Sequence, residues 1–274
     1  MVDARWIPLA GTANTRDLGG LPLVGGGRTV PGRVLRSDDL QELTPDDVAA
    51  LVDRLGLSAV VDLRTSAEVR MEGRGPLREV AAVDHRHFTL IPEVGEYTDV
   101  FAEDADAADV DVPEDWVETL LPRTAAPGDE GESPSVKAYL GYLSDGADNV
   151  VGALRAVTEA SGAAVVHCAA GKDRTGVVCA LALSVAGVAA SDVVADYALT
   201  AERIEGVVAK LAARPTYAED MARRDVASHT PRAETMRRVL ELLDERYGGA
   251  AGWLTAHGFG PDEQTTLRDK LTRP

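Results

Sequence analysis

The sequence predicts an α/β fold. Short apolar runs typical of buried strands alternate with longer segments in which apolar residues recur at helical spacing. The chain has 274 residues, of which 45% are hydrophobic and 27% are charged, and this is the composition of an ordinary globular protein. The length is enough for one large domain or two small ones, with a sizeable core.

One helix and two strands are predicted in the N-terminal part of the chain. Thr44, followed by proline, is typical of a helix N-cap, and the helix ends at Gly56. Residues 58–63 form an apolar run that indicates a short buried strand. Alternation over residues 85–91 predicts another strand, which Pro92 ends.

Helices dominate the C-terminal part of the chain. Residues 163–166 form a compact apolar strand, and an apolar helix over residues 175–186 ends at Gly187. Further helices are predicted over residues 136–143, 149–160, 191–197, 201–225, 232–247 and 261–271.

The segment 93–133 differs in charge from the rest of the chain. It contains fourteen acidic residues and one basic residue, Arg123, so it carries −13 of the formal net charge of −17. We interpret it as a long acidic insertion with one helix near residues 116–121. Two alternatives are open for this insertion, a solvated loop and a lid over a pocket.

Charge and hydropathy exclude several function classes. The chain has 28 basic and 45 acidic residues, which argues against nucleic acid or an anionic bilayer as a partner. It has no run of about 18 apolar residues, so no integral membrane association is expected. The first residues lack the basic-then-apolar order of a signal peptide. We expect a cytoplasmic protein, with leaderless secretion as the open alternative. The sequence does not indicate the oligomeric state.

The most informative stretch is residues 165–176, where a buried strand leads into a short loop that opens an apolar helix. Such a loop directs several backbone N–H groups at one point, and the helix dipole adds partial positive charge. The stretch therefore predicts a cradle for an anion. The predicted phosphate-binding residues are Ala169, Ala170, Gly171, Lys172, Asp173, Arg174 and Thr175.

Cys168 lies at the base of this cradle. A helix N-terminus and a nearby cation can lower the pKa of a cysteine to about 3.5–7.5, which favours the nucleophilic thiolate. Thr175 can donate a hydrogen bond to that thiolate. Arg174, six residues after the cysteine, can hold two phosphoryl oxygens with its planar guanidinium. The spacing predicts a nucleophile, an anion cradle and a clamp around one phosphorus atom.

The loop does not fit the motifs of nucleotide, dinucleotide or zinc sites. A nucleotide-binding P-loop would have glycine in place of Val166 and serine or threonine in place of Asp173. The glycine run 25–27 lacks the last glycine of a dinucleotide-binding motif. No second ligand pair stands at zinc spacing from His167 and Cys168, so we predict that His167 braces the loop through hydrogen bonds. Neither a metal nor a cofactor is predicted.

The signature His-Cys-x2-Gly-Lys-Asp-Arg-Thr-Gly resembles that of the bacterial tyrosine phosphatases, a family of Cys-x5-Arg cysteine phosphatases. The resemblance implies a single domain over residues 1–274, built on a central, mostly parallel sheet flanked by helices. It also implies a helical lid near residues 201–230. Other segments that resemble family motifs are Asn14–Gly20, Arg36 with Ser37, Val61–Arg64 and Glu234–Leu254.

The resemblance implies a ping-pong reaction through a phosphocysteine. Cys168 would attack phosphorus, Arg174 would hold the phosphoryl oxygens, and water would hydrolyse the intermediate. The leaving group also needs a proton from a general acid.

Two aspartates compete for the role of general acid. Asp173 lies inside the loop, and its structural alternative is a cap on the following helix. Asp62 ends its strand, at the edge where ligand sites of α/β proteins gather. Its structural alternative is an ion pair with Arg16 or Arg64.

Three further groups of residues have predicted roles around the loop. The resemblance implies that Lys172 helps to bind substrates with more than one phosphate, such as phosphoinositides; its alternative is a solvated loop lysine. Arg16 and Asp17, from the N-terminal motif, are predicted to support the loop. Asn14 either orients the loop as well or forms a turn.

The leading functional hypothesis is a protein-tyrosine phosphatase whose substrates are phosphotyrosine proteins, with phosphoserine, phosphothreonine and phosphoinositides as further candidates. The second hypothesis is a catalytically silent module that binds phosphorylated partners. The third is another enzyme that combines a cysteine with an oxyanion, such as a sulfurtransferase or an arsenate reductase. Arsenate reduction would require a resolving cysteine, and Cys179, in the middle of a predicted helix, is badly placed for that.

Overall fold

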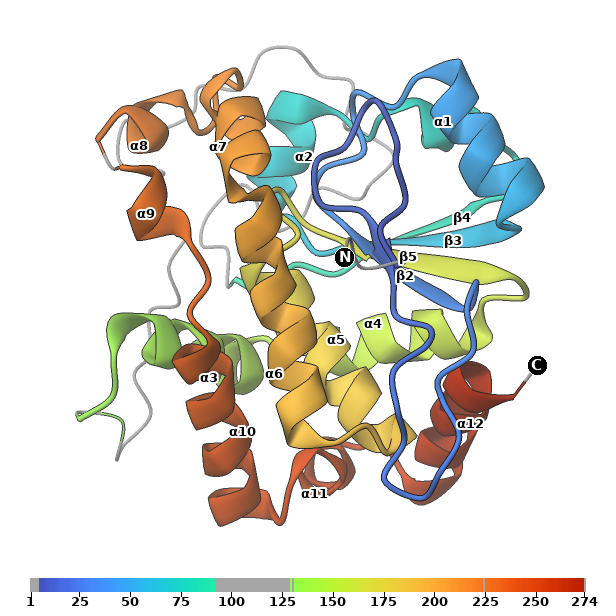
Figure 1. Cartoon of the computed structure of the whole chain (residues 1–274), viewed down its shortest axis with the longest axis vertical. Coiled ribbons are helices and arrows are strands. Elements are labelled where there is room, and N and C mark those ends of the chain that lie inside the picture. Colours follow the sequence, from blue (N-terminus) through green and yellow to red (C-terminus); the bar gives the residue numbers. More distant parts are fainter. Residues whose placement is uncertain (1–4, 92–128, 130, 224, 274) are drawn as a thin grey trace.

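The computed structural model describes residues 5–91, 129, 131–223 and 225–273. These residues fold around a five-stranded sheet in the order β1-β2-β5-β3-β4 (Figure 1). β1 and β2 are antiparallel, and the other three pairs of neighbours are parallel, which confirms the prediction of a mostly parallel sheet. The strands are β1 (Arg16–Asp17), β2 (Val34–Ser37), β3 (Leu57–Asp62), β4 (Asp84–His87) and β5 (Ala163–His167).

Helices make up most of the remaining described chain. They are α1 (Pro45–Ala49), α2 (Ser66–Glu72), α3 (Pro134–Asp145), α4 (Ala147–Glu159), α5 (Asp173–Ala186), α6 (Ala190–Ala198), α7 (Ile204–Ala212), α8 (Ala218–Arg223), α9 (Val226–His229), α10 (Ala233–Tyr247), α11 (Ala250–Ala256) and α12 (Pro261–Thr272). A π-helical segment, Ala50–Arg54, continues α1, and short 3₁₀ turns span Pro76–Glu79 and Leu199–Arg203.

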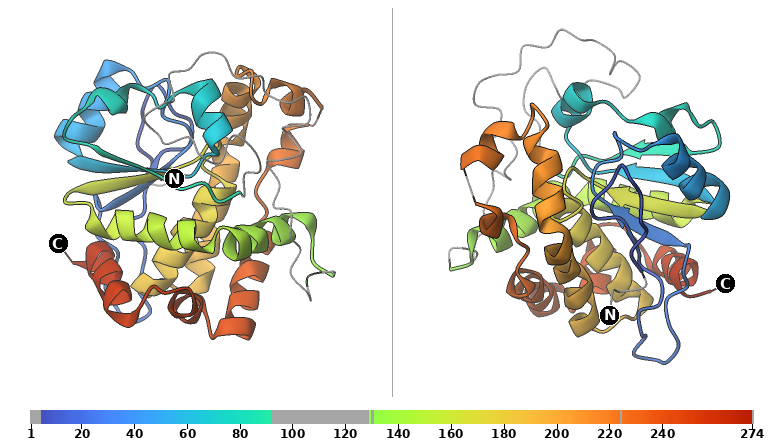
Figure 2. Two further views of the ribbon diagram at one scale, coloured as in Figure 1. Left: turned by 180° about the vertical axis from the view of Figure 1, so that it is seen from behind. Right: turned by 45° about the horizontal axis from the view of Figure 1, so that its top comes forward.

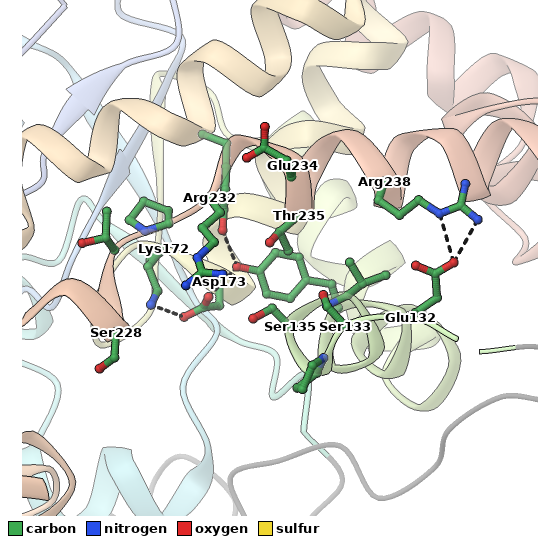
Figure 3. Close-up of a pocket in the computed structure, with 16 residues that line it drawn as sticks. Glu132, Ser133, Ser135, Lys172, Asp173, Ser228, Arg232, Glu234, Thr235 and Arg238 are labelled. Carbon is green, nitrogen blue, oxygen red and sulfur yellow. Dashed lines mark hydrogen bonds and ion pairs between the residues drawn. The ribbon is translucent and has the colours of Figure 1, made fainter. Parts of the chain in front are cut away.

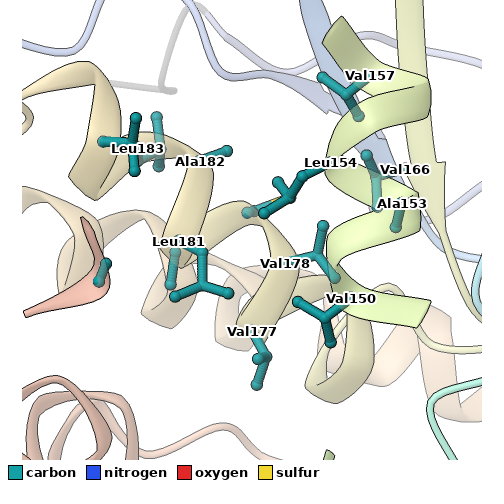
Figure 4. Close-up of a cluster of buried hydrophobic side chains, with 14 of the residues drawn as sticks. Val150, Ala153, Leu154, Val157, Val166, Val177, Val178, Leu181, Ala182 and Leu183 are labelled. Carbon is teal, nitrogen blue, oxygen red and sulfur yellow. The ribbon is translucent and has the colours of Figure 1, made fainter. Parts of the chain in front are cut away.

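Both faces of the sheet are covered, because successive residues of a strand point to opposite sides. Val166 of β5 lies in a large apolar cluster with Val150 of α4 and Val178 of α5 (Figure 4). Val165, one residue earlier, lies in a second cluster with Leu51 from the segment after α1. Helices α10, α11 and α12 contact α5 or α6 and form an outer layer on the α5 side (Figure 2).

Local capping signals explain where the early helices begin. Thr44 accepts a hydrogen bond from the backbone N–H of Asp47, whose carboxylate in turn accepts from the backbone N–H of Thr44. The same reciprocal arrangement joins Thr65 and Glu68 at the start of α2. The predicted helix after Thr44 is therefore confirmed, and the chain turns after it at Gly56, which has a φ of +65°.

Several elements differ from the sequence predictions. β1, β2, α2, α9 and α11 were not expected; β2 has only four residues, all buried, so no alternation marks it. The prediction of one continuous helix over residues 201–225 is wrong. Pro215 lies between α7 and α8, and proline lacks the N–H that a helix interior requires.

Most of the acidic insertion, including the predicted helix near residues 116–121, lies outside the described residues. Its C-terminal end is described and is bound to α10. Asp129 is buried and forms an ion pair of 2.6 Å with Arg246. Glu132 pairs with Arg238 at 2.9 Å, just before α3 begins. None of the described helices combines the length and the apolar character needed to cross a bilayer.

Candidate active site

The site lies where β2, β3 and β5 end at the same edge of the sheet. In the strand register Ser37 and Asp62 both stand beside His167, so the loops that follow the three strands meet there. The carboxyl edge of parallel strands is where α/β folds place their ligands. Cys168 follows β5 directly at this edge and is buried.

The loop that follows Cys168 is held by contacts with β2 and with the segment before β1. Gly171 has a φ of +62°, and a Cβ atom there would lie 2.3 Å from the carbonyl oxygen of Ser37. Asn14 donates its amide N–H to the carbonyl oxygens of Ala170 and Gly171 at 3.0 and 3.2 Å. Arg36 donates to the same Gly171 carbonyl at 2.8 Å. These bonds hold the loop carbonyls, and the N–H groups of the first turn of α5 have no acceptor within the helix.

A buried ionic cluster supports those two side chains. Asp196 of α6 accepts hydrogen bonds from Arg36 at 2.8 Å and from Arg16 at 3.3 Å. Burial alone would raise the pKa of Asp196, but the guanidinium groups of Arg16, Arg36 and Arg5 outweigh it and hold that pKa far below its usual range. Arg16 also donates to Asn14 at 2.5 Å, so it acts on the loop through Asn14.

Among the described residues, Asp17 has no hydrogen bond to the loop that the sequence predicted it to support. Its carboxylate accepts from the backbone N–H groups of Gly19 and Gly32, at 2.7 and 2.6 Å. It therefore closes the segment that joins β1 to β2. The prediction failed because adjacent residues of a strand point in opposite directions, so Arg16 and Asp17 cannot both face the loop.

Arg174 is held in one orientation by Glu68 of α2. Its Nη1 and Nη2 donate to the two carboxylate oxygens of Glu68 at 2.5 and 2.8 Å. Glu68 is fully buried, and although burial would raise its pKa, Arg174 keeps that pKa below its usual value. Sequence reasoning missed Glu68; its only local signal was the capping-box spacing from Thr65.

The Thr175 hydroxyl group is buried in the first turn of α5. It has no hydrogen-bond partner among the residues that the structure describes. An unpaired buried hydroxyl is costly, so it fits a site that is completed by a bound group or an ionised neighbour. Cys179 lies further along α5, and burial raises the pKa of its thiol to about 11, which disfavours a nucleophilic thiolate at that position.

Asp173 opens α5 and faces a pocket of about 450 Å³. The Tyr139 hydroxyl donates to its Oδ1 at 2.5 Å, and Lys172 Nζ lies 3.5 Å from its Oδ2. Figure 3 shows Lys172 and Asp173 beside one another at this pocket, with Ser228 and Arg232 from the segment around α9 and α10. Tyr139 was not foreseen from the sequence, because it lies on a distant helix.

Asp62 forms the ion pair that was its structural alternative. Arg64 donates to it from Nε at 2.9 Å and from Nη2 at 2.6 Å, and also from its backbone N–H. Burial alone would raise the pKa of Asp62, but Arg64 and then His167 lower it well below its usual range. A carboxyl group that holds its charge so firmly is a poor proton donor. This geometry argues against Asp62 as the general acid.

His167 lies between the strand ends. Its Nε2 is 3.6 Å from Asp62 and its Nδ1 is 3.4 Å from the carbonyl oxygen of Cys168. Burial lowers the pKa of His167 to about 4, so the ring is neutral near neutral pH. Among the residues that the structure describes, no group of three or more His, Cys, Asp or Glu side chains could hold a metal ion.

Helices α7 and α8 cover the loop from the outside. Ala169 lies in an apolar cluster with Val207 and Leu211 of α7. Tyr217, just before α8, donates its hydroxyl to Glu68, the carboxylate that holds Arg174. Lys172 donates to the carbonyl oxygen of His229 at 2.8 Å, at the end of α9.

Charged side chains tie α7 and the turn after it to the loop that follows β2. Lys210 donates to the carbonyl oxygen of Gly11 at 2.6 Å and lies 3.3 Å from Asp38. Arg214 pairs with Asp39 at 3.0 Å and with Glu72 of α2 at 3.3 Å. The covering helices are thus held by polar contacts at their edge and by apolar contacts over Ala169.

Comparison with known proteins agrees with this geometry. The model of the tyrosine phosphatase family matches residues 7–273. The triple specificity protein phosphatase PtpB of Mycobacterium tuberculosis is 29% identical over 265 residues, which is 88% of this chain and 91% of that protein. A tyrosine-protein phosphatase of Nostoc commune is 34% identical over 122 residues, 43% of this chain and 42% of its own. A putative tyrosine-protein phosphatase of Cupriavidus necator is 31% identical over 186 residues, 68% of this chain and 59% of its own. The chain therefore belongs to the tyrosine phosphatase family.

Proposed function

We propose that this chain is a protein-tyrosine phosphatase that hydrolyses phosphomonoesters through a phosphocysteine on Cys168. The observation that carries the proposal is the pairing of Arg174 with Glu68, which fixes a guanidinium in the same loop as a buried cysteine. Phosphoryl transfer needs positioning and charge stabilisation more than any other contribution, and this loop supplies both.

The first step forms the phosphocysteine. The Cys168 thiolate attacks phosphorus, a sulfur–phosphorus bond forms, and the bond between phosphorus and the ester oxygen breaks. The guanidinium of Arg174 and the N–H groups of the first turn of α5 stabilise the phosphoryl oxygens. We expect the Thr175 hydroxyl, which has no hydrogen-bond partner among the described residues, to donate to the sulfur atom.

The second step regenerates the enzyme. A water molecule attacks phosphorus, the sulfur–phosphorus bond breaks, and Cys168 leaves as a thiolate with inorganic phosphate as the product. Arg174 holds the phosphoryl group in the same way during both steps. The base that accepts a proton from the attacking water is the group that acted as the acid in the first step.

We assign that acid and base role to Asp173. Its carboxyl group faces the pocket of about 450 Å³; among the described residues, the neutral phenol of Tyr139 donates to it at 2.5 Å and the Lys172 ammonium lies 3.5 Å from its other oxygen. Asp62, in contrast, is fixed by the cationic side chain and the backbone of Arg64. A general acid must carry a proton in the enzyme–substrate complex, and a neutral donor with an ammonium group at 3.5 Å opposes this less than a guanidinium at 2.6 Å.

The proposed substrates are phosphotyrosine proteins, with phosphoserine, phosphothreonine and phosphoinositides to be tested beside them. The relative from Mycobacterium tuberculosis, named a triple specificity phosphatase, supports that wider panel. Lys172 lines the same pocket as Asp173 and could bind a second phosphate. The hypothesis of a catalytically silent module has no observation in its favour, because Cys168, Asp173 and Arg174 are all present.

The segment 201–230 is proposed to act as a lid. Its apolar residues cover Ala169, and the Tyr217 hydroxyl reaches the carboxylate beside Arg174. Because Cys168 is buried, we infer that these contacts separate before a phosphorylated side chain reaches it. Replacing Lys210 with alanine, which removes its contacts to Gly11 and Asp38, is expected to raise kcat/KM by easing opening.

The function is tested by C168S. This variant is expected to lose turnover of an aryl phosphate while it still binds inorganic phosphate, because the cradle and Arg174 remain. Turnover is measured by release of the phenol, and phosphate binding by calorimetry. Turnover in C168S close to that of the wild type would refute the covalent mechanism, and the phosphate titration shows that the variant is folded.

A further inference from the structure

We propose that Tyr139 positions the carboxyl group of Asp173 for proton transfer, and that Tyr197 in turn holds Tyr139. This inference rests on the proposed role of Asp173 as general acid. The three side chains come from three different helices, α5, α3 and α6, and meet at one wall of the pocket of about 450 Å³.

The geometry of the three groups is that of a hydrogen-bonded chain. The Tyr139 hydroxyl lies 2.5 Å from Oδ1 of Asp173 and 2.7 Å from the Tyr197 hydroxyl. The two tyrosine rings meet edge to face, with centroids 6.1 Å apart and an interplanar angle of 80°. Both tyrosines are 2% exposed, so packing leaves their rings little freedom.

The direction of the hydrogen bonds follows from protonation. Burial, followed by the nearby charge of Asp173, raises the pKa of Tyr139 well above its usual value, so the phenol keeps its proton. A phenol has one hydrogen to donate. Tyr139 gives that hydrogen to Asp173, and its oxygen is then free to accept the hydrogen of Tyr197.

This arrangement assigns separate tasks to the two oxygens of Asp173. Oδ1 is occupied by the hydrogen of Tyr139, so the transferable proton is carried on Oδ2. Lys172 Nζ lies 3.5 Å from Oδ2, which is longer than a good hydrogen bond, and Oδ2 can therefore turn to the ester oxygen of a substrate. Figure 3 shows Asp173 and Lys172 side by side at the pocket.

The proton transfer is balanced without any change at Tyr139. As the bond between phosphorus and the ester oxygen breaks, the proton on Oδ2 passes to that oxygen and Asp173 becomes a carboxylate. The hydrogen bond from Tyr139 to Oδ1 persists and stabilises the new charge. In the second step Oδ2 takes a proton from the attacking water. Tyr139 neither gains nor loses a proton, so it is a positioning residue.

A glycine of the phosphatase signature leaves space for the two hydrogen-bonded tyrosines. A Cβ atom at Gly176 would lie 2.9 Å from Cδ2 of the Tyr197 ring. A side chain there would push Tyr197 away from α5, and with it the hydroxyl that holds Tyr139. The loop, its acid and the two tyrosines are thus connected through Gly176.

The test compares two esters with different needs for a proton. p-Nitrophenolate is a weak base and leaves without protonation, whereas phenolate needs the general acid. We expect D173N to lower kcat/KM for phenyl phosphate by about 10²–10⁴-fold and for p-nitrophenyl phosphate far less. Y139F is expected to lower kcat/KM for phenyl phosphate by about tenfold, again with a much smaller loss on p-nitrophenyl phosphate. kcat/KM is used because it covers only the steps up to cleavage of the ester bond.

Two further variants control the measurement. Y197F removes the outer member of the chain and is expected to give the same pattern with a smaller loss. Y247F removes the hydroxyl of a half-exposed tyrosine at the end of α10 and should leave both esters unaffected. Binding of inorganic phosphate, measured for every variant, shows that the cradle is intact, and if Y139F does not fold, Y197F carries the test.

The outcomes separate this inference from the function it rests on. If D173N lowers kcat/KM equally for both esters, Asp173 is not the general acid. The role of Asp173 and the positioning role of Tyr139 then both fail. If D173N discriminates between the esters but neither Y139F nor Y197F does, the general acid stands and the positioning role of Tyr139 is overturned.

Discussion

Asp62 ends β3 and Asp173 begins α5, so the two carboxyl groups lie near the same edge of the sheet. Asp62 is bound by a guanidinium and a backbone N–H of Arg64, and its side chain is 11% exposed. Asp173 is bound by the phenol of Tyr139, and its side chain is 36% exposed. The two residues have the same side chain and differ in how closely a cation binds it: Arg64 Nη2 lies 2.6 Å from Asp62, whereas Lys172 Nζ lies 3.5 Å from Asp173.

That difference determines what each carboxyl group can do. A guanidinium at hydrogen-bond distance stabilises the carboxylate and fixes the ends of the strands, at the cost of proton transfer. A neutral donor orients the carboxyl group while leaving it able to carry a proton. The strand side of the loop is therefore suited to stability and the pocket side to catalysis, and four predictions test this division.

The largest effect is expected for D173N. Asparagine has the shape of aspartate, but its amide cannot act as a general acid. kcat/KM for phenyl phosphate should fall by about 10²–10⁴-fold. The basic limb of the pH–rate profile, which reports the protonated acid, should flatten. A profile with an unchanged basic limb would place the acid elsewhere.

D62N is expected to act on stability instead of rate. It leaves the buried guanidinium of Arg64 without its carboxylate partner, and loss of one partner of a buried ion pair costs about 3–5 kcal/mol. Denaturant unfolding measures this loss in the free energy of unfolding. If D62N leaves the free energy of unfolding unchanged and selectively lowers kcat/KM for phenyl phosphate, Asp62 is the general acid and the assigned roles of the two aspartates are wrong.

His167 predicts how stability depends on pH. Its pKa is 6.5 in the unfolded chain and is lowered by burial to about 4 in the folded protein. Between these values the unfolded chain binds the additional proton, so the free energy of unfolding falls as the pH falls from about 6.5 to about 4. The loss amounts to up to ~3 kcal/mol.

The control for this prediction is H167N, which cannot titrate. Its free energy of unfolding should be less dependent on pH in that window, when both proteins are unfolded by denaturant at each pH. Carboxylates with lowered pKa values, such as Asp62, begin to lose their contribution only below about pH 5, and they do so equally in both proteins, so the difference between the wild type and H167N isolates the histidine. Equal slopes for the wild type and H167N would contradict the assignment.

The smallest effect is expected for K172A. If Lys172 binds a second phosphate, its removal should lower kcat/KM for a phosphoinositide with two phosphates by about five- to tenfold relative to phenyl phosphate. The ratio of the two values is the measurement, because a general loss of activity cancels in it. A ratio equal to that of the wild type would leave Lys172 with a structural role alone, through its hydrogen bond to the His229 carbonyl oxygen.

The sequence predicted those parts of the site that are local in the chain. The strand 163–166, the loop and the helix that follows it are contiguous, and their order alone predicts the anion cradle. The α/β class and the helix after Thr44 followed in the same way from alternation and capping signals. The mostly parallel sheet came instead from the resemblance of the signature to a known family.

The parts that could not be predicted are those that meet only in the folded chain. Glu68 has the local pattern of a capping box, and nothing near it in sequence indicates that it holds Arg174. Tyr139 and Tyr197 follow ordinary helical spacing and would be assigned to the core. The prediction for Asp17 had the opposite weakness. Its neighbour Arg16 acts on the loop through Asn14, and proximity in sequence suggested a shared role, but Asp17 bonds to Gly32 instead.

The proposed function depends on Cys168 carrying the phosphoryl group. Exchange of labelled oxygen between inorganic phosphate and water tests it most directly, because the phosphocysteine forms in the reverse direction whatever step limits turnover. The wild type is expected to remove heavy oxygen from labelled phosphate, as followed by phosphorus NMR, and C168S to show no exchange while still binding phosphate. Exchange in C168S at the rate of the wild type, or a wild type that turns over esters without exchange, would show that Cys168 does not carry the phosphoryl group.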